Sequence, residues 1–278
     1  MPLAKAAFED LTDYSVGFIV GRSDQIGDLG LIGSGTLVSF DGFRAILTAH
    51  HVLTALPDTG LVGLLTPTRF GSRIHRLNVN MQYIKKVFIA KGLNDAQGPD
   101  LGLLILAPTD WSKFPSGKTF YNLAKRRDFV LNQLPGVNRG AWVLCGMVGE
   151  RTRELDARDE SRYGKGKSFL GIMINAIHAG QREADGYDFI SVEVEYNDSY
   201  EGPESFGGCS GGGLWQLLIS EKEDGSLEIF HSLLAGVAFY QSGMNGLRRT
   251  IECHGWKSLY KKVIDAIQIE KQTGSVSR

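Results

Sequence analysis

The segment GSGTLVSFDGFRAILTA, residues 33–49, decides the fold that we expect. It contains two short apolar runs, residues 33–40 and 43–49, which a Phe-Asp-Gly turn joins. Apolar runs of this length on either side of so short a turn are typical of a β-hairpin. The segment therefore predicts two adjacent antiparallel strands.

Further short apolar or alternating runs lie on both sides of this hairpin. They cover residues 15–21, 83–90 and 101–106 in the first half of the chain, and residues 141–149, 168–177, 188–196, 212–220, 230–241 and 248–253 in the second. Residues 107–140 are broken by prolines and glycines and show no such pattern. Thirty-five glycines in 278 residues, against a background of roughly 7%, also favour a turn-rich β protein.

This grouping predicts an all-β fold of two antiparallel β-barrels of the six-stranded type, followed by a C-terminal α-helix. The first barrel takes residues 10–110, a linker takes 111–138, and the second barrel takes 139–254. The helix is expected at residues 255–270, where large apolar side chains recur at helical spacing and would dock on the second barrel. These side chains are Trp256, Leu259, Tyr260, Val263, Ile264 and Ile267.

Composition argues against several classes of function. The chain has 30 basic and 31 acidic residues, a net charge of −1, and hence no basic field for nucleic acid or an anionic membrane. It shows neither a membrane-spanning apolar run nor the apolar stretch of a secretory signal. Three cysteines, Cys145, Cys209 and Cys253, are too few and too scattered for a disulfide framework or a zinc cluster. We expect a soluble protein of a reducing compartment, the cytoplasm, without a metal or another cofactor.

Three motifs carry chemistry, and they follow one another in a definite order. LTAHHVL, residues 47–53, places two histidines at a strand end, and an imidazole can take and return a proton near neutral pH. PDLGLLIL, residues 99–106, places an aspartate ahead of an apolar strand. FGGCSGGGLW, residues 206–215, places a serine in a glycine turn whose N–H groups can converge on an oxyanion. A phosphate-binding loop is disfavoured there, because no Gly-Lys-Ser/Thr follows and the turn leads into a strand.

Together these motifs resemble those of the trypsin-like serine peptidases, which have the chymotrypsin fold. That family has T-A-x-H after a strand, D-[IL]-[AG]-L-L before a strand, and G-x-S-G-G. Here they read Thr-Ala-His-His at 48–51, Asp-Leu-Gly-Leu-Leu at 100–104, and Gly-Cys-Ser-Gly-Gly at 208–212. LAGVAFY, residues 234–240, looks like the family's strand that pairs with the substrate backbone.

The resemblance implies a role for each residue that matches a motif. Ser210 is the expected nucleophile. His51, at the fourth position of T-A-x-H, is the expected general base in preference to His50. Asp100 would accept the other ring N–H of His51 and stabilise the imidazolium. Asp95 is the rival for this role, and we favour Asp100 because it directly precedes the apolar strand.

The resemblance also assigns the groups around the reacting carbonyl. The backbone N–H groups of Gly208 and Ser210 would form the oxyanion hole. Ala238, Phe239 and Tyr240 would bind an extended peptide by adding it as a strand, which gives an affinity that most substrate side chains do not change. Both assignments follow from the positions that these residues occupy in the family's motifs.

Substrate preference is expected from Glu204, which stands at the position of the base of the family's primary specificity pocket. A carboxylate there would favour Arg or Lys before the cut. Arg248 and Arg249 lie where the far wall is expected and would neutralise this carboxylate, and Gln241 replaces a glycine at the pocket mouth. A surface position for Glu204 is the alternative.

Two departures from the secreted members of the family are informative. Val52 stands where they have a cysteine after the catalytic histidine, which favours an intracellular branch. Cys209 stands where they have an aspartate that pairs with a new N-terminus after propeptide cleavage. We therefore expect an active loop that needs no such cleavage. Cys209 itself sits one position early for a nucleophile and is expected to be a small buried residue.

We therefore expect an intracellular serine endopeptidase that cleaves protein or peptide substrates through an acyl-enzyme intermediate. The alternative is a catalytically silent trypsin-like domain that acts as a peptide- or protein-binding module. Residues 150–168 are nearly all charged or polar and are expected to form a solvated surface loop. A regulatory partner protein is a further expectation, because such a protease must restrict its targets.

Overall fold

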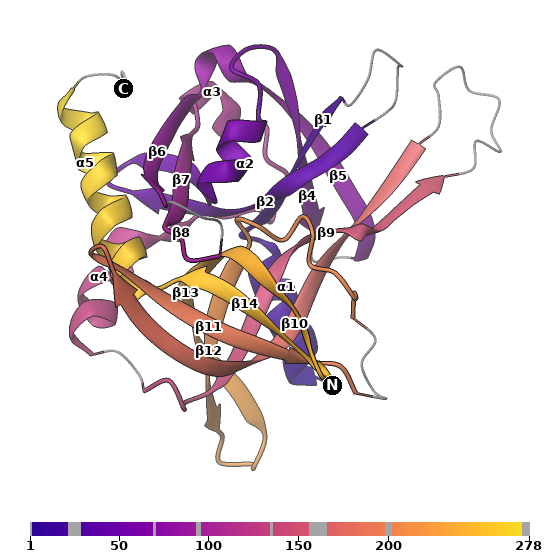
Figure 1. Ribbon diagram of the computed structural model, residues 1–278, viewed down its shortest axis with the longest axis vertical. Coiled ribbons are helices and arrows are strands. Elements are labelled where there is room, and N and C mark those ends of the chain that lie inside the picture. Colours follow the sequence, from indigo (N-terminus) through magenta and orange to yellow (C-terminus); the bar gives the residue numbers. More distant parts are fainter. Residues whose placement is uncertain are drawn as a thin grey trace.

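The first half of the chain forms one mainly antiparallel β-sheet, the upper body in Figure 1. The computed structural model describes residues 2–21, 29–68, 71–92, 96–133, 136–155, 166–197 and 202–273. Within these residues the sheet has eight strands in the order β5-β4-β1-β2-β3-β7-β6, and β8 pairs with β2. The strands are β1 (Ser15–Gly21), β2 (Leu29–Phe40), β3 (Phe43–Thr48), β4 (Leu61–Thr68), β5 (Gly71–Asn80), β6 (Lys85–Lys91), β7 (Asp100–Ile105) and β8 (Tyr121–Asn122).

The second half forms a closed six-stranded barrel, the lower body in Figure 1. Its strands follow one another in the order β10-β11-β14-β13-β12-β9. They are β9 (Ala141–Leu155), β10 (Gly166–Ala184), β11 (Tyr187–Glu195), β12 (Gly213–Glu221), β13 (Leu227–Asn245) and β14 (Arg248–His254). The predicted architecture of two antiparallel β units is confirmed, although in the described residues the first unit has eight strands rather than six.

The hairpin expected at residues 33–49 is present as β2 and β3. Phe40 pairs with Phe43, which leaves Asp41 and Gly42 as a two-residue turn with φ of 45° and 88°. Positive φ at both turn positions matches the twist of a two-residue hairpin. β3 ends at Thr48, so the two histidines of the first motif begin the next helix at the end of this strand.

Helices lie against the outside and the ends of the two sheets. They are α1 (Pro2–Thr12), α2 (His50–Ala55), α3 (Pro108–Trp111), α4 (Leu123–Asn132) and α5 (Ile264–Gln272), with a 3-10 turn at Met81–Tyr83 and a π-helical segment at Ser258–Val263. The π-helical segment leads directly into α5 and confirms the predicted C-terminal helix. No helix among the described residues has the length and apolar character that crossing a membrane requires.

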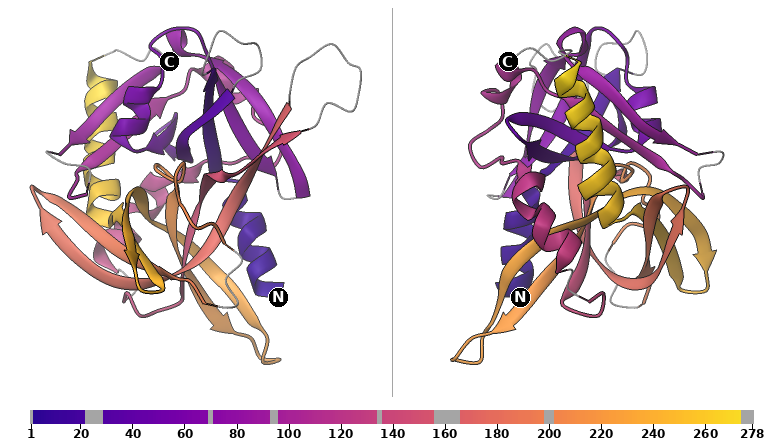
Figure 2. Two further views of the ribbon diagram at one scale, coloured as in Figure 1. Left: turned by 45° about the vertical axis from the view of Figure 1, so that its right-hand side comes forward. Right: turned by 90° about the vertical axis from the view of Figure 1, so that its left-hand side faces the viewer.

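The C-terminal helix contacts both sheets, as the right-hand view of Figure 2 shows. Tyr260 is fully buried, and its hydroxyl donates to the Leu234 carbonyl at 3.1 Å and lies 3.2 Å from the Tyr121 hydroxyl. At the other end, Glu270 forms an ion pair with Lys85 of β6. The predicted apolar stripe is therefore docked on the barrel, while the polar end of the helix reaches the first sheet.

Several elements were not expected from the sequence. β4 contains Pro67, which weakens a strand signal, and β5 is largely polar. The loop expected at residues 150–168 is in part strand, because β9 extends to Leu155 and β10 begins at Gly166, and these two residues pair. Main-chain pairing can extend a hairpin without an apolar face. Residues 156–165 lie outside the described residues. The expected linker, residues 111–138, contains β8 and α4, and α3 ends where it begins. The domain boundaries stay predictions.

Candidate active site

His51 lies at the start of α2, where the chain leaves the first sheet. Val52 and Leu53 are fully buried and fix this short helix, while the His51 side chain stays 47% exposed. The imidazole Nδ1 lies 2.5 Å from Oδ2 of Asp100, and the His51 backbone N–H donates to Oδ1 at 2.9 Å. Both carboxylate oxygens therefore bind the same residue and set the orientation of its ring.

Asp100 is the first residue of β7, and its side chain is 10% exposed. Burial alone would raise the pKa of its carboxyl group. The hydrogen bonds and the charge of His51 outweigh this effect and hold the pKa below its usual value. The carboxylate is therefore ionised at neutral pH and favours a proton on Nδ1 of His51. Such a carboxylate stabilises the imidazolium that forms when the other ring nitrogen accepts a proton.

A second histidine, His254, lies behind Asp100 and was not singled out by the sequence analysis. Its Nε2 accepts the backbone N–H of Asp100 at 2.9 Å. The ring is fully buried next to Tyr187, Phe189 and Phe239, at centroid distances of 5.9, 5.1 and 5.0 Å. Burial lowers the pKa of His254 to about 3, so the ring is neutral and Nε2 can accept. His254 thus fixes the start of β7 and the carboxylate that it carries.

The buried imidazole of His254 predicts a pH-dependent stability. Its pKa is about 3 in the folded chain and about 6.5 in an exposed imidazole, so below pH 6.5 the unfolded chain takes up a proton that the folded chain does not. The contribution of the neutral His254 ring to the free energy of unfolding is complete above pH 6.5. It declines towards pH 3, by at most about 1.4 kcal/mol per pH unit. The measurement is the free energy of unfolding in urea at several pH values between 4 and 7. As the pH falls, this free energy should decrease less steeply in His254→Gln than in the wild type. The same change at the exposed His75 is the control, and an unchanged slope in His254→Gln would contradict the assignment.

Ser210 lies in a tight loop ahead of β12. Gly208 and Gly211 have φ of 97° and 87°, which side chains rarely adopt. A Cβ on Gly211 would lie 2.0 Å from the carbonyl oxygen of Ser34, so only glycine fits this position. The Gly211 N–H donates to the Ala238 carbonyl at 2.7 Å, which ties the loop to β13. The glycines thus permit a turn that presents the serine between two strands.

The backbone N–H groups of Gly208 and Ser210 remain available. In the part of the chain that the structure describes, neither donates a hydrogen bond to a protein acceptor, and the Ser210 hydroxyl has no protein partner. Two unused N–H groups, two residues apart in a glycine turn, are the donors that an oxyanion hole requires.

Ser34 of β2 connects this loop to the first sheet, and the sequence analysis missed it. Its hydroxyl donates to the Gly208 carbonyl and accepts the Met147 N–H, both at 2.7 Å. Its own N–H donates to the Ser210 carbonyl, also at 2.7 Å. A Cβ on the preceding Gly33 would lie 3.1 Å from that carbonyl oxygen, so glycine allows the close approach. One buried serine therefore holds the loop through two hydrogen bonds, and the third ties the same serine to β9.

A cavity of about 420 Å³ lies between the two sheets, and both His51 and Ser210 line it. The remaining lining residues belong to the second half of the chain and are mostly apolar: Phe206, Gly207, Cys209, Ala238, Phe239, Tyr240, Gln241 and Ile251. The described pairing of β13 with β12 ends at Val237. Residues 239–241 therefore border the cavity as a strand with one edge that no strand covers among the residues described.

Glu204, the expected acidic base of the specificity pocket, is not among the residues that line this cavity. It is exposed, and its backbone N–H donates to the Glu150 carboxylate at 3.1 Å, which holds the turn in this position. Gln241 lines the cavity instead, and Arg249 Nη1 donates to its Oε1 at 3.0 Å. Arg248 pairs with carboxylates of β11. The guanidinium of Arg249 therefore stands behind the wall of the cavity that Gln241 forms.

Two neighbouring candidates, Cys209 and His50, take other positions in the structure. Cys209 is 2% exposed, and burial raises the pKa of its thiol to about 12, so no thiolate forms at neutral pH. The His50 ring packs against Phe88 at 4.8 Å between centroids, and no hydrogen bond joins His50 to Asp100. Asp95 lies outside the described residues. Within the described segments, no three His, Cys, Asp or Glu side chains are grouped as a metal site would need.

Comparisons with known proteins bear on the fold. Neither a family model nor a curated protein matches the sequence. Among solved structures, the chain is similar to the Drosophila Grass clip serine protease of the Toll pathway, with a TM-score of 0.53 and 13% identity over 96% of this chain and 72% of that one. It is also similar to an inactive serine-to-alanine mutant of Rv3671c from M. tuberculosis H37Rv, with a TM-score of 0.44 and 13% identity over 96% and 93% of the two chains. The likeness to the Drosophila protease shows that the two β units and the terminal helix form a chymotrypsin-like fold.

Proposed function

We propose that this protein is a serine endopeptidase that cleaves protein or peptide substrates through an acyl-enzyme intermediate. One observation carries the proposal: Ser210 and His51, from opposite sheets, line the same cavity, and the ionised Asp100 holds the ring of His51. A carboxylate with a structural role alone does not require hydrogen bonds to both the backbone N–H and the ring of one histidine. Here that histidine is half-exposed and lines a cavity with a serine. The unused N–H groups of Gly208 and Ser210 add the donors that acyl transfer requires.

The proposed reaction uses His51 and Ser210 of this cavity, the backbone of the adjoining Gly208 and a water molecule. Ser210 Oγ attacks the carbonyl carbon of the peptide bond while His51 Nε2 accepts the hydroxyl proton. The C=O electron pair moves onto oxygen, and the N–H groups of Gly208 and Ser210 stabilise this oxyanion. As the carbonyl re-forms, the C–N bond breaks and His51 gives its proton to the leaving amine. Water then cleaves the ester of Ser210 by the same sequence and restores the hydroxyl.

The proposed substrate is an extended chain with an apolar residue before the cut. Residues 239–241 offer an open strand edge beside Ser210, to which a peptide can add through main-chain hydrogen bonds. Phe206, Tyr240 and Ile251 line the cavity with apolar surface. Burying a Lys or Arg side chain there would leave its charge without a carboxylate partner, which is costly.

We further propose that the enzyme acts inside the cell. All three cysteines are free and buried, and burial raises the pKa of each thiol. Stabilisation by packing rather than by disulfides is usual for proteins of reducing compartments. Protein substrates and any regulatory partner would then be found in the same compartment.

A fluorophosphonate probe tests the proposed nucleophile directly. The probe forms a covalent bond only with an activated serine, so the wild-type protein should be labelled and Ser210→Ala should not. Ser112→Ala, at an exposed serine far from the cavity in sequence, is the matched control and should be labelled at the wild-type rate. Absence of labelling in all three proteins would favour the alternative, a peptide-binding module without catalysis. Labelling of Ser210→Ala would assign the nucleophile elsewhere.

A further inference from the structure

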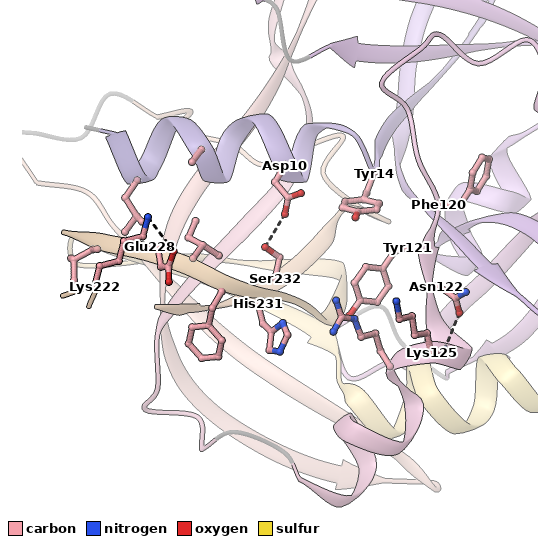
Figure 3. Close-up of a pocket in the computed structure, with 16 residues that line it drawn as sticks. Asp10, Tyr14, Phe120, Tyr121, Asn122, Lys125, Lys222, Glu228, His231 and Ser232 are labelled. Carbon is pink, nitrogen blue, oxygen red and sulfur yellow. Dashed lines mark hydrogen bonds and ion pairs between the residues drawn. The ribbon is translucent and has the colours of Figure 1, made fainter. Parts of the chain in front are cut away.

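A second cavity, of about 690 Å³, lies between α1, the start of α4 and the β12–β13 hairpin (Figure 3). None of its lining residues lines the cavity at Ser210. The hairpin projects beyond the barrel beside α1, as both views of Figure 2 show, and α1 packs against β13. Nothing in the reaction proposed above uses this groove, so its features need a separate explanation.

One wall of the groove is a strand edge without a strand partner. β13 pairs with β12 from Leu227 onward, but its described pairing with β14 begins only at Val237. On that second side, residues 227–232 therefore have no neighbouring strand among the described residues, and all six line the groove. Such an edge offers N–H and C=O groups to an added strand. Six residues span about 20 Å.

The same strand carries apolar side chains that face solvent. Leu227 is 57% exposed and Phe230 is 50% exposed. Tyr14 and Tyr121 stand at the other end of the groove in Figure 3, where their rings meet edge to face at 5.7 Å. Exposed apolar side chains along an open edge favour an occupant that has its own apolar side chains. The groove thus suits an extended chain better than a small polar ion.

Two cations at the α4 end of the groove have no partner. Among the described residues, the side chains of Lys125 and Arg126 take part in no hydrogen bond and no ion pair. The other charged side chains of the groove are engaged, since Lys222 pairs with Glu228 at 3.2 Å and Asp10 accepts the Ser232 hydroxyl at 2.9 Å. The Ser232 hydroxyl does not neutralise Asp10, but Lys125, Arg126 and Lys222 against Asp10 and Glu228 give the groove a formal charge of +1. An acidic group complements this charge.

The remaining titratable side chains of the groove, His231 and the tyrosines, do not change its positive charge at neutral pH. Burial, followed by the charge of Arg126, lowers the pKa of His231, so the imidazole is mainly neutral at pH 7. Burial, with the charge of Asp10, raises the pKa of Tyr14 to about 12 and keeps its hydroxyl protonated as a donor. Neither group supplies a negative charge that would pair with Lys125 or Arg126.

We propose that this groove is a docking site for an extended acidic peptide segment of another protein. The segment adds as a strand to residues 227–232, its apolar side chains cover Leu227 and Phe230, and a carboxylate binds Lys125 and Arg126. The site stands whether or not Ser210 is a nucleophile, since it shares no residue with that cavity. It would give the protein a means of choosing a substrate or a regulator at a distance from the cut.

Fluorescence anisotropy tests the site with a fluorescein-labelled hexapeptide that alternates valine and aspartate. The full-length Ser210→Ala protein is used, so that the peptide stays intact. Arg126→Glu in this background should weaken binding at least tenfold, because it replaces attraction with repulsion. Arg127→Glu, the same charge change on the next residue of α4, does not line the groove and should bind like the parent protein. Circular dichroism and melting temperature establish that both variants fold.

Four further measurements decide between occupants. A valine–lysine hexapeptide should bind at least tenfold more weakly than the valine–aspartate peptide, and N-methylation of alternate amides should weaken the latter by a similar factor. If the methylated peptide bound as tightly as the unmethylated one, strand addition would be overturned. If Arg127→Glu weakened binding as much as Arg126→Glu does, the proposed site would be overturned. Tighter binding of labelled hexathymidylate would assign the groove to nucleic acid. A wild-type dimer that Arg126→Glu dissociates would assign it to a second copy of this chain. Either result overturns the proposal.

Discussion

Replacing Ser210 by alanine is expected to lower the turnover number on a fluorogenic peptide by on the order of 10⁶-fold. The substitution removes Oγ, the atom that would bond to the substrate carbonyl carbon, and the alanine side chain offers no other nucleophile. The neighbouring Cys209 is buried, and its thiol, with a pKa of about 12, is protonated at neutral pH. Because the rest of the cavity is unchanged, KM should move far less than the turnover number.

Steady-state kinetics with an apolar residue before the scissile bond provides the measurement. Ser112→Ala serves as the control, because it removes an exposed hydroxyl and leaves the cavity intact. Unfolding curves of both variants should overlie that of the wild type, which separates loss of chemistry from loss of structure. Residual turnover in Ser210→Ala within tenfold of the wild type would remove Ser210 from the reaction.

Asp100→Asn is expected to lower the turnover number by on the order of 10⁴-fold, the loss seen when the triad aspartate of a serine protease becomes an amide. The carboxylate now accepts from Nδ1 of His51 at 2.5 Å, and the low pKa keeps it ionised. An amide N–H in that position would donate to Nδ1 and move the ring proton to Nε2. His51 could then no longer accept the proton of Ser210.

Asp110→Asn is the matched control for this prediction. Asp110 is also a buried carboxylate of the first half of the chain, 3% exposed and paired with Lys113 at 2.5 Å, but it lies outside the cavity. It should change the free energy of unfolding and leave the turnover number within a few-fold. Similar losses of turnover in both variants would mean that Asp100 acts through stability rather than through the ring of His51.

The fold class and three polar residues could be predicted from the sequence for different reasons. The hairpin at residues 33–49 was predictable because its turn and its apolar runs are local signals. His51, Asp100 and Ser210 stand in motifs whose spacing reflects chemistry that the family shares. Whether they act as proposed stays a prediction, but the structure places His51 against Asp100 and brings His51 and Ser210 to one cavity.

His254 and Ser34 could not be predicted in the same way. His254 reaches Asp100 across 154 residues of sequence, and Ser34 reaches the Gly208 carbonyl across 174. Neither contact has a local pattern, although the glycines on either side of Ser34 were a sign of close backbone approach. Glu204 was assigned by counting back from Ser210. The turn that Glu150 holds directs Glu204 to solvent, which no count of residues reveals.

The hydrogen bonds of Ser34 have a consequence for control of the protein. Ser34 belongs to one half of the molecule, whereas Gly208 and Ser210 belong to the other. In the proposed reaction, the N–H groups of Gly208 and Ser210 would therefore be correctly oriented only while the two halves remain docked. A binding protein that separated the two halves would therefore abolish the proposed hydrolysis without occupying the substrate site.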